Sequence, residues 1–545
     1  AALTKVGVVA IDREARLIAV SMDANVDAFL RTIEPMLDLT QDVVLDRQVG
    51  DFLTGRLETA LKAIGNPSLA MATGTPTMQV IGKAAPKTAT AHLPVADVLW
   101  DTARLAQTKT NRDAAGARRI LDSLNVRLND SQWDAWREAM EKRLALIWGP
   151  PGTGKSQTLR AILLGLVLEA HAAGKPIRIL VTSNTYDATD NVVLRMFERI
   201  LQLGEAVTGK VRLARLRSGA KEPLASLSPD IDMLTDPKSA IVGDLHDYLT
   251  ACVGSAIVSA TPQQVSRFTG VRGNAAHPLF DVILIDEASQ MDMANAVLSL
   301  APIAADGSVI IVGDPKQLPP IQQVEAPLGL ETLVGSVYDF VAEHRKVASK
   351  DLLVNYRSNS TIVGLGRLAG DPASLRAHLP DLRITTDVQL PSTQPSDWPQ
   401  HLAFSPELAK LLNPAEPISA FVYPEGRSSQ WNEFEAQTVA SLLWLLRGHL
   451  NASLEHDPDA TATGLHTPTK FWTHAVGVVT PHRAHKSLVV SRLQSLFAPL
   501  GDDPHLIREA VNTVERFQGQ QRDVIKVIKR TRPICASQRQ PASTT

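Results

Sequence analysis

The sequence has few cysteines and no long apolar run. Cys252 and Cys535 are the only two cysteines in 545 residues, and they stand far apart, so neither a disulfide framework nor a cysteine zinc site is available. No run of about 18 apolar residues occurs, and the N-terminus lacks a basic segment followed by an apolar one. We therefore expect a cytoplasmic protein without a membrane partner.

Neither sign of charge is in excess. The formal net charge of −2 provides no overall attraction to nucleic acid or to an anionic membrane, so a polyanionic partner would need a local groove. At 545 residues, with 44% hydrophobic residues, the chain is an ordinary globular sequence too long for one core, and we expect two to four domains. Because it begins at Ala1 and not Met, we expect an upstream part of the protein to be missing.

The stretch Gly-Pro-Pro-Gly-Thr-Gly-Lys-Ser at 149–156 predicts a phosphate-binding loop. It follows an apolar run at 144–148 that is typical of a buried strand, and it precedes helical apolar spacing at 157–167. The glycines let backbone N–H groups surround an anion at the positive end of the helix dipole. Lys155 would neutralise the β- and γ-phosphates, and the Ser156 hydroxyl would ligate Mg²⁺. ATP and Mg²⁺ are therefore the expected cofactors.

Two adjacent carboxylates follow a second apolar strand. The run at 280–285 leads into Asp286 and Glu287. Asp286 can hold Mg²⁺ together with Ser156, and Glu287 can orient and deprotonate the attacking water. An acidic surface pair is the alternative, but the preceding apolar run argues against it.

The strand at 309–312 leads into Gly-Asp-Pro-Lys-Gln-Leu-Pro-Pro at 313–320. Gln317 could hydrogen-bond the γ-phosphate or the catalytic water. A turn with a polar tip is the alternative.

Three other polar groups allow two interpretations each. Gln132 could hydrogen-bond an adenine edge, or it could be a solvated helix residue. The triplet Thr182-Ser-Asn184 follows a strand, where α/β sheets bind ligands, but helix capping explains it equally well. The basic run at 210–221 could contact phosphates or form a solvated strand face.

An alternation of strands and helices resumes after residue 351 and predicts a second α/β unit. It includes strands at 418–422 and 476–481 and a helix around 432–436. At its start, Tyr356 offers a ring for stacking on a base, and Arg357 offers a planar fork for a phosphate. The N-terminal part of the chain shows a hairpin pattern at 6–20 and helical spacing at 24–64, but no catalytic constellation.

In their order along the chain these motifs resemble those of superfamily 1 helicases, in the up-frameshift-like branch that includes the nonsense-mediated-decay helicase and bacterial AAA-domain relatives. DEAD-box helicases fit less well, because Ser259-Ala-Thr261 here precedes the acidic motif. Hexameric AAA+ machines are not expected to carry GDPKQLPP or a second lobe. The similarity covers about residues 120–528 and rests on Leu128-Asn-x-x-Gln132, GPPGTGKS, Thr182-Ser-Asn184, DEASQ, GDPKQLPP, Asn355-Tyr-Arg357, Val479-Thr-Pro481 and Val514-x-x-Phe-Gln-Gly519.

The resemblance implies an α/β P-loop NTPase with two tandem RecA-like parallel-sheet lobes and an N-terminal accessory region. ATP would bind between the lobes, and a single strand of DNA or RNA would cross their top. A monomeric motor moving 5′ to 3′, alone or within a larger complex, is expected. The implied divisions are an accessory or stalk region at 1–112, the first lobe at 113–350, an incomplete second lobe at 351–530 and a disordered tail at 531–545.

The resemblance also implies roles for individual residues. The hydrolytic shell would be Lys155, Ser156, Asp286, Glu287, Gln317 and Arg357. Nucleotide would bind at Gln132, Gly149, Pro150, Pro151, Gly152, Thr153, Gly154, Lys155, Ser156, Tyr356 and Gln521. Contacts to the strand would come from Thr182, Ser183, Asn184, Thr261, Pro262, Thr480 and Thr513.

The sequence departs from the family pattern at two places. Gln521 stands where relatives usually have a Glu that holds the ribose, and it could still form a weaker hydrogen bond. The last motif, which supplies an arginine finger, is absent, and only the polar residues 529–545 follow Ile528. We therefore expect a truncated or frame-altered end. Since an arginine finger contributes about 10³ to 10⁵ in rate, we expect this chain to bind ATP but to hydrolyse it slowly or not at all. An ATP-binding scaffold with little or no hydrolysis is the alternative to a motor. We find no convincing nuclease constellation.

Overall fold

The protein is described by a computed structural model in which the chain forms two compact units, Ala1–Thr54 and Gly55–Thr545. In the first unit, β1 (Gly7–Asp12) and β2 (Leu17–Ser21) pair antiparallel, which confirms the predicted hairpin. Predictions for Gln521, for the tail 531–545 and for a helix within 24–53 lie outside the described residues. The structure describes residues 7–12, 17–21, 54–64, 94–218, 228, 230–235, 239–270, 278–320, 333–383, 393–394, 396, 398–400, 402, 404–413, 415–423, 431–450, 466–517, 520 and 522–527.

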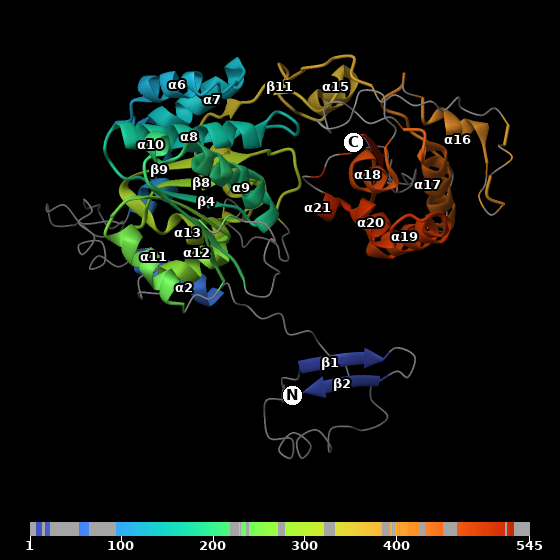
Figure 1. The fold of residues 1–545 in the computed structure, drawn as a ribbon, viewed down its shortest axis with the longest axis horizontal. Helices are drawn as coiled ribbons and strands as arrows, with labels where there is room; N and C mark the ends of the chain where they lie inside the picture. Colours follow the sequence, from blue (N-terminus) through green and yellow to red (C-terminus); the bar gives the residue numbers. More distant parts are fainter. Residues whose placement is uncertain are drawn as a thin grey trace, which may run out of the picture. The chain divides into compact units, whose positions relative to one another are not determined.

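The larger unit contains an eight-stranded sheet whose neighbouring strands all run parallel (Figure 1). Short crossovers cannot join parallel strands, so helices alternate with the strands along the chain. The predicted α/β class is confirmed. The strand order is β10 (Lys350–Asp351), β3 (Leu144–Trp148), β9 (Ile303–Gly313), β8 (Phe280–Ile285), β4 (Arg178–Thr182), β7 (Ser255–Ala260), β5 (Val211–Leu216) and β6 (Ile231–Leu234).

Helices cover both faces of this sheet, which explains its nearly continuous apolar strands. Along β8, Val282 and Leu284 enter one core while Ile283 and Ile285 enter the other, as the two-residue period of a strand requires. One face is covered by α6 (Ala114–Ser123), α7 (Asp130–Glu141), α8 (Lys155–Ala172) and α9 (Tyr186–Leu203). The other is covered by α4 (Pro94–Trp100), α5 (Thr102–Gln107), α11 (Ala240–Thr250), α12 (Pro262–Thr269) and α13 (Met293–Leu300).

Helices α4 and α5 belong to the core of the first lobe. Val95, Val98 and Leu105 are buried in the same cluster as Ile283 and Val309. Helix α2 (Thr54–Ile64) also packs against this cluster through Leu57 and Ile64. Part of the region 1–112, which we expected to be an accessory, therefore contributes to the lobe that holds the phosphate loop.

The division expected between residues 350 and 351 falls inside strand β10, which extends the first sheet beside β3. The chain then forms β11 (Val354–Asn355), which pairs with β12 (Arg376–Ala377), and α15 (Ser360–Leu368). Leu352, between β10 and β11, is buried in the core around α8. The segment 350–355 is thus packed on the first lobe.

A second core surrounds a three-stranded parallel sheet in the order β14 (Val511–Thr513), β13 (Val476–Thr480) and β15 (Val524–Val527). It is covered by α17 (Glu433–Leu446), α19 (Arg483–Phe497) and α20 (Pro504–Ala510), and α21 (Val514–Phe517) follows β14. The predicted strand at 418–422 is wrong, since these residues form no regular ladder. The other short helices are α10 (Glu205–Thr208), α14 (Val337–Asp339), α16 (Pro406–Lys410) and α18 (Pro468–Lys470).

None of the described helices combines the length and the apolar character that crossing a membrane requires.

Candidate active site

The loop between β3 and α8 has the backbone shape that its glycines predict. Gly152 and Gly154 have positive φ angles of 77° and 78°, in the left-handed region that disfavours other residues. A Cβ at Gly154 would lie 2.5 Å from Nε2 of Gln132, and one at Gly152 would lie 2.6 Å from Cβ of Arg357. Side chains from outside the loop therefore fit against it only because these positions are glycine.

Lys155 and the acidic couple lie together at the carboxyl edge of the sheet. Nζ of Lys155 is 3.4 Å from Oε1 of Glu287, and both side chains are mostly buried. Asp286 N–H donates to the Thr182 carbonyl at 2.9 Å, which joins the end of β8 to the end of β4. The strand–loop–helix and the strand ending in two carboxylates thus converge on one point.

Asp286 is 5% exposed, and its environment opposes ionisation. Burial raises its pKa to about 7, and the charge of Glu287 acts in the same direction, against the opposing charge of Lys155. Its Oδ1 accepts a hydrogen bond of 2.8 Å from the N–H of Glu287, which itself has a left-handed φ of 50°. A divalent cation beside Asp286 would offset the free-energy cost of its buried negative charge.

The segment Asn355-Tyr-Arg357 is attached to the phosphate loop. Asn355 Nδ2 donates to the Pro151 carbonyl at 2.8 Å, and Tyr356 N–H donates to the Gly152 carbonyl at 2.8 Å. Oδ1 of Asn355 accepts from the N–H groups of Arg357 and Ser358, each at 2.8 Å. Sequence reasoning gave Asn355 no role, although it belongs to the Asn-Tyr-Arg motif.

Arg357 is the buried cation best placed for a phosphate. Burial lowers the pKa of its guanidinium, and the charge of Glu287 acts against that shift. Its buried Nε has no hydrogen-bond partner among the described residues. A buried donor without a partner costs about 1–3 kcal/mol, and more when charged, so an anion at this position would be stabilising.

Gln132 is buried and not solvated. Its Oε1 accepts from Asn129 N–H at 3.0 Å, and its Nε2 donates to the Thr153 carbonyl at 3.1 Å. Together with the Asn129 side chain this is a capping box for α7, which ties that helix to the phosphate loop. An amide can form further hydrogen bonds, so contact with adenine stays a prediction.

Tyr356 is held from two sides. Its hydroxyl accepts from Asn129 Nδ2 at 2.9 Å, and its ring lies 4.7 Å from that of His378 at an angle of 44°. These contacts orient the ring that we expect to stack on a base.

Asp314, which the motif analysis did not single out, organises the loop after β9. It is 1% exposed, and it accepts hydrogen bonds from Trp148 Nε1 at 3.1 Å and from Gln317 Nε2 at 3.2 Å. Its own N–H donates to Ser289 Oγ at 3.3 Å. The sequence contains a signal for this residue, because Asp314 directly follows an apolar strand, as Asp286 does.

The residues of the first lobe that we expect to contact nucleic acid lie at or just after the ends of β4 and β7, which are neighbours in the sheet. Thr182, Ser183 and Thr261 are all buried, and Asn184 donates to the Gln290 carbonyl at 2.6 Å. Pro262 is a buried residue at the start of α12. These side chains shape the sheet edge, and in this structure few of them reach its surface.

Two arginines of the basic run after residue 210 are paired with carboxylates. Arg212 pairs with Asp232 and Asp244 at 2.8 Å each, and Arg215 pairs with Asp190. This favours a structural role over phosphate binding.

The remaining predicted residues complete the loop and the second sheet. Thr153 Oγ1 donates to the Pro150 carbonyl at 2.7 Å. Thr480 and Thr513 face each other in the register of β13 and β14, and both are buried. A cation at Ser156 and Asp286 would need phosphate or water as further ligands, since the described residues contain no group of three or more His, Cys, Asp or Glu that could hold a metal.

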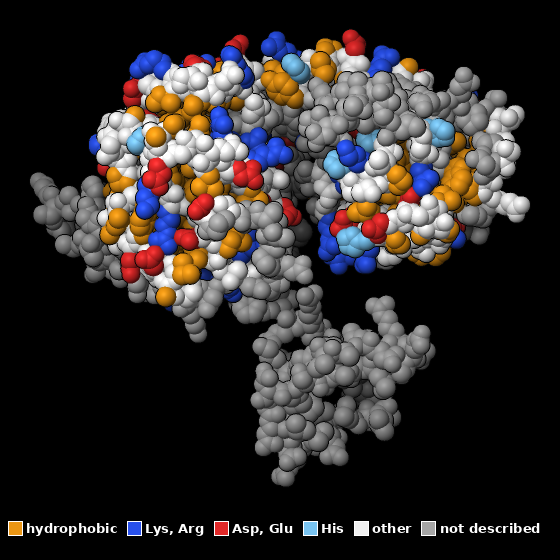
Figure 2. Space-filling view, in the orientation of Figure 1, with side chains coloured by type: hydrophobic (Ala, Val, Ile, Leu, Met, Phe, Trp, Pro, Cys, Tyr) orange, Lys and Arg blue, Asp and Glu red, His pale blue; other side chains and the backbone are white. Residues whose placement is uncertain are grey.

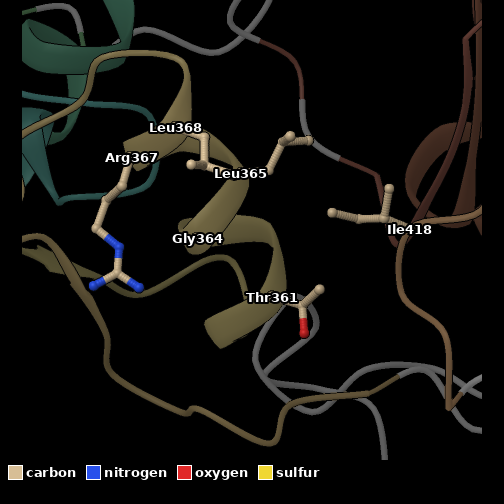
Figure 3. Close-up of a pocket in the computed structure, with 6 residues that line it drawn as sticks. All are labelled: Thr361, Gly364, Leu365, Arg367, Leu368 and Ile418. Carbon is tan, nitrogen blue, oxygen red and sulfur yellow. The ribbon is translucent and has the colours of Figure 1, made fainter.

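A separate apolar hollow lies along α15. Figure 3 shows Thr361, Gly364, Leu365, Arg367 and Leu368 of this helix, with Ile418 opposite. It offers no acid–base chemistry, so the phosphate loop remains the candidate active site.

Comparison with known proteins gives one matching family model and several relatives. The model of an AAA domain matches residues 127–238 and 252–323. A DNA replication ATP-dependent helicase/nuclease DNA2 from Xenopus laevis is 26% identical over 431 residues, which cover 75% of this chain and 35% of the relative. The Saccharomyces cerevisiae protein of the same name is 30% identical over 244 residues, covering 45% of this chain and 14% of the relative. The DNA-binding protein SMUBP-2 of Mesocricetus auratus is 29% identical over 286 residues, covering 47% and 28%. The chain thus spans about a third or less of the length of these relatives.

Proposed function

We propose that the chain is a superfamily 1 helicase of the up-frameshift-like branch and acts as an ATP-driven translocase on single-stranded nucleic acid. The match to an AAA-domain model and the similarity to DNA2 helicases support this proposal. DNA is the favoured strand, because the relatives are named as DNA helicases and as a DNA-binding protein. The observation that carries the proposal is the 3.4 Å contact between Lys155 and Glu287 beside the glycine loop.

The residues at the loop divide the work of ATP hydrolysis. Lys155 and the loop N–H groups bind the β- and γ-phosphates, and Arg357 provides a second cation whose buried Nε has no hydrogen-bond partner among the described residues. Glu287 orients a water molecule and accepts its proton. Asp286 and Ser156 would hold Mg²⁺, which would supply positive charge beside the phosphates.

Nucleotide recognition and strand movement are further parts of the proposal. Gln132 and Tyr356 would contact adenine, and Gln317 would respond to the γ-phosphate through the loop that Asp314 holds. Hydrolysis would alternate the grip of two RecA-like lobes on the strand, moving a monomer 5′ to 3′.

ATPase activity with and without single-stranded DNA or RNA tests this function. The expected result is hydrolysis that rises when a single strand is added, more with DNA than with RNA. Glu287→Gln should abolish hydrolysis while ATP binding persists, and Glu205→Gln, at an exposed position in α10, is the matched control. Hydrolysis that no nucleic acid stimulates would refute the translocase. ATP-dependent strand binding without hydrolysis would instead support the scaffold alternative.

Direction can be measured separately with partial duplexes. Displacement of the paired strand from a substrate with a 5′ overhang is expected, and displacement only with a 3′ overhang would reverse the proposed polarity.

A further inference from the structure

The second lobe needs a way to hold a strand other than its two buried threonines. Thr480 and Thr513 end β13 and β14 side by side, but they are only 0% and 8% exposed. A nucleic-acid backbone is bound mainly through its phosphates, by cations at the surface. The residues around these strand ends are therefore the place to look for cations.

Three cations gather at this edge from three helices. Lys486 is in the first turn of α19, and its Nζ donates to Asn512 Oδ1 at 2.7 Å, one residue before Thr513. Arg508 is in α20, and Arg516 is in α21. Helix α19 packs against α20 and against β14, and α21 begins where β14 ends, so the three helices meet at this edge. Burial lowers the pKa of the Lys486 ammonium, and the charges of Arg516 and Arg508 lower it further.

We call Lys486, Arg508 and Arg516 the basic cluster. Figure 2 shows a group of Lys and Arg side chains, with some Asp and Glu side chains beside it, on the surface near α20 and α21 of Figure 1. Arg508 and Arg516 are exposed, and Lys486 is partly buried. The cluster therefore presents its charge to solvent.

Among the described residues, the basic cluster has no paired carboxylate, unlike two other cations of this lobe. Arg447 pairs with Asp502 at 2.6 Å, and Arg492 of α19 pairs with Glu433 at 2.7 Å. None of the three clustered cations forms an ion pair with a carboxylate of the described residues. The first turn of α19 also contains no acidic residue. Like charges held together without a counterion are unfavourable, and a polyanion at this position would relieve the repulsion.

We propose that Lys486, Arg508 and Arg516 bind consecutive phosphates of the single strand where β13 and β14 end. This inference rests on the proposed function and assigns the strand a contact surface on the second lobe. The contact carries no base specificity, because phosphates are common to all sequences.

The test is the salt dependence of binding to a fluorescein-labelled oligothymidylate, measured by fluorescence anisotropy. For single strands each phosphate contact contributes about 0.7 to the slope of log K against log salt concentration. Arg508→Gln/Arg516→Gln should reduce the slope by about 1.4, and adding Lys486→Gln should reduce it by about 2.1. At about 0.1 M salt the triple variant should bind about 100-fold more weakly. An oligodeoxycytidylate should lose the same factor.

Arg492→Gln is the matched control, since it removes a cation of the same helix that is already paired with Glu433. Its slope should equal that of the unmodified protein. Because Arg508 and Arg516 are exposed, the double variant should keep its melting temperature.

Two outcomes would overturn the inference. Unchanged slopes in the double and triple variants, with strand binding by the unmodified protein intact, would reject the basic cluster and leave the proposed function standing. Weaker binding of a fluorescent ATP analogue, with unchanged slopes, would show that the cluster serves the nucleotide's phosphates. If the unmodified protein neither binds the strand nor hydrolyses ATP faster with it, the proposed function itself fails.

Discussion

Replacing Asn355 with Ala should weaken ATP binding although this side chain is not expected to touch ATP. Asn355 is 6% exposed and makes three hydrogen bonds of 2.8 Å, to the Pro151 carbonyl and from the N–H groups of Arg357 and Ser358. It fastens the Asn355-Tyr-Arg357 segment to the phosphate loop. The substitution therefore releases a support of the loop and the backbone that positions Arg357.

The magnitude follows from the number of bonds. At about 0.5–1.5 kcal/mol each, three hydrogen bonds contribute roughly 1.5–4.5 kcal/mol. If about 1.4 kcal/mol of this is lost from the ATP complex, affinity falls about tenfold. Titration with a fluorescent ATP analogue and Mg²⁺ measures this directly, and thermal unfolding measures the part lost as stability.

Asn359→Ala is the matched control. Asn359 is 7% exposed, accepts from Ile362 N–H at 3.0 Å and donates to the Leu382 carbonyl at 3.0 Å, but makes no hydrogen bond to the phosphate loop. It should lower the melting temperature to a similar degree and leave ATP affinity within about twofold, since it removes a helix cap worth about 1 kcal/mol. Equal ATP affinity of the Asn355→Ala variant and the unmodified protein would refute the reasoning.

Three further substitutions test other parts of the structure. Gly154→Ala should reduce ATP affinity by about tenfold or more, because φ is 78° and the new Cβ would lie 2.5 Å from Gln132 Nε2; undiminished titration of the ATP analogue would contradict this. Arg357→Gln should lower the DNA-stimulated kcat by about 100-fold or more with a smaller change in ATP affinity. An unchanged kcat in steady-state kinetics would mean that Arg357 is only structural. Burial lowers the pKa of Lys526 to about 8 from 10.5, so the folded state is penalised fully below pH 8 and less as pH rises towards 10.5. Lys526→Met should therefore raise the melting temperature at pH 7 more than at pH 10, and an equal gain at both would refute the charge argument.

The sequence predicted the parts of the site that depend on local pattern. A strand, a glycine loop and a helix at 144–172, and an apolar strand ending in Asp286, are each encoded by neighbouring residues. The strand at 418–422 was predicted from the same kind of apolar run, but a strand also needs a pairing partner, and these residues have no regular ladder.

Residues whose partners are distant in sequence were missed for a physical reason. Asn355 bonds to Pro151, 204 positions away, and Trp148 bonds to Asp314, 166 positions away. Helix α4 enters the core of the first lobe by contacting β9, which lies about two hundred residues later in the chain. The periodicity of neighbouring residues does not indicate such long-range contacts. In the sequence, a buried Asn or Asp therefore cannot be distinguished from one in a turn.

In the phosphate loop the carbonyl groups and the N–H groups of the peptides have different partners. The carbonyls of Pro151 and Gly152 accept from Asn355 and from the N–H of Tyr356, while the N–H groups of such a loop are the expected donors to phosphate. Hydrogen bonds at both ends of a peptide group strengthen each other, so binding of phosphate and attachment of the segment should be coupled. The coupling must be reciprocal: if ATP binding strengthens the attachment of the segment, attachment of the segment raises the affinity for ATP by the same factor.

Helix α15 begins four residues after Tyr356, so a short stretch of chain connects the phosphate loop to the part of the chain that leads into the second lobe. The Asn355→Ala substitution removes the side-chain hydrogen bond that fastens this segment to the loop. The same variant therefore tests both nucleotide binding and its effect on the segment.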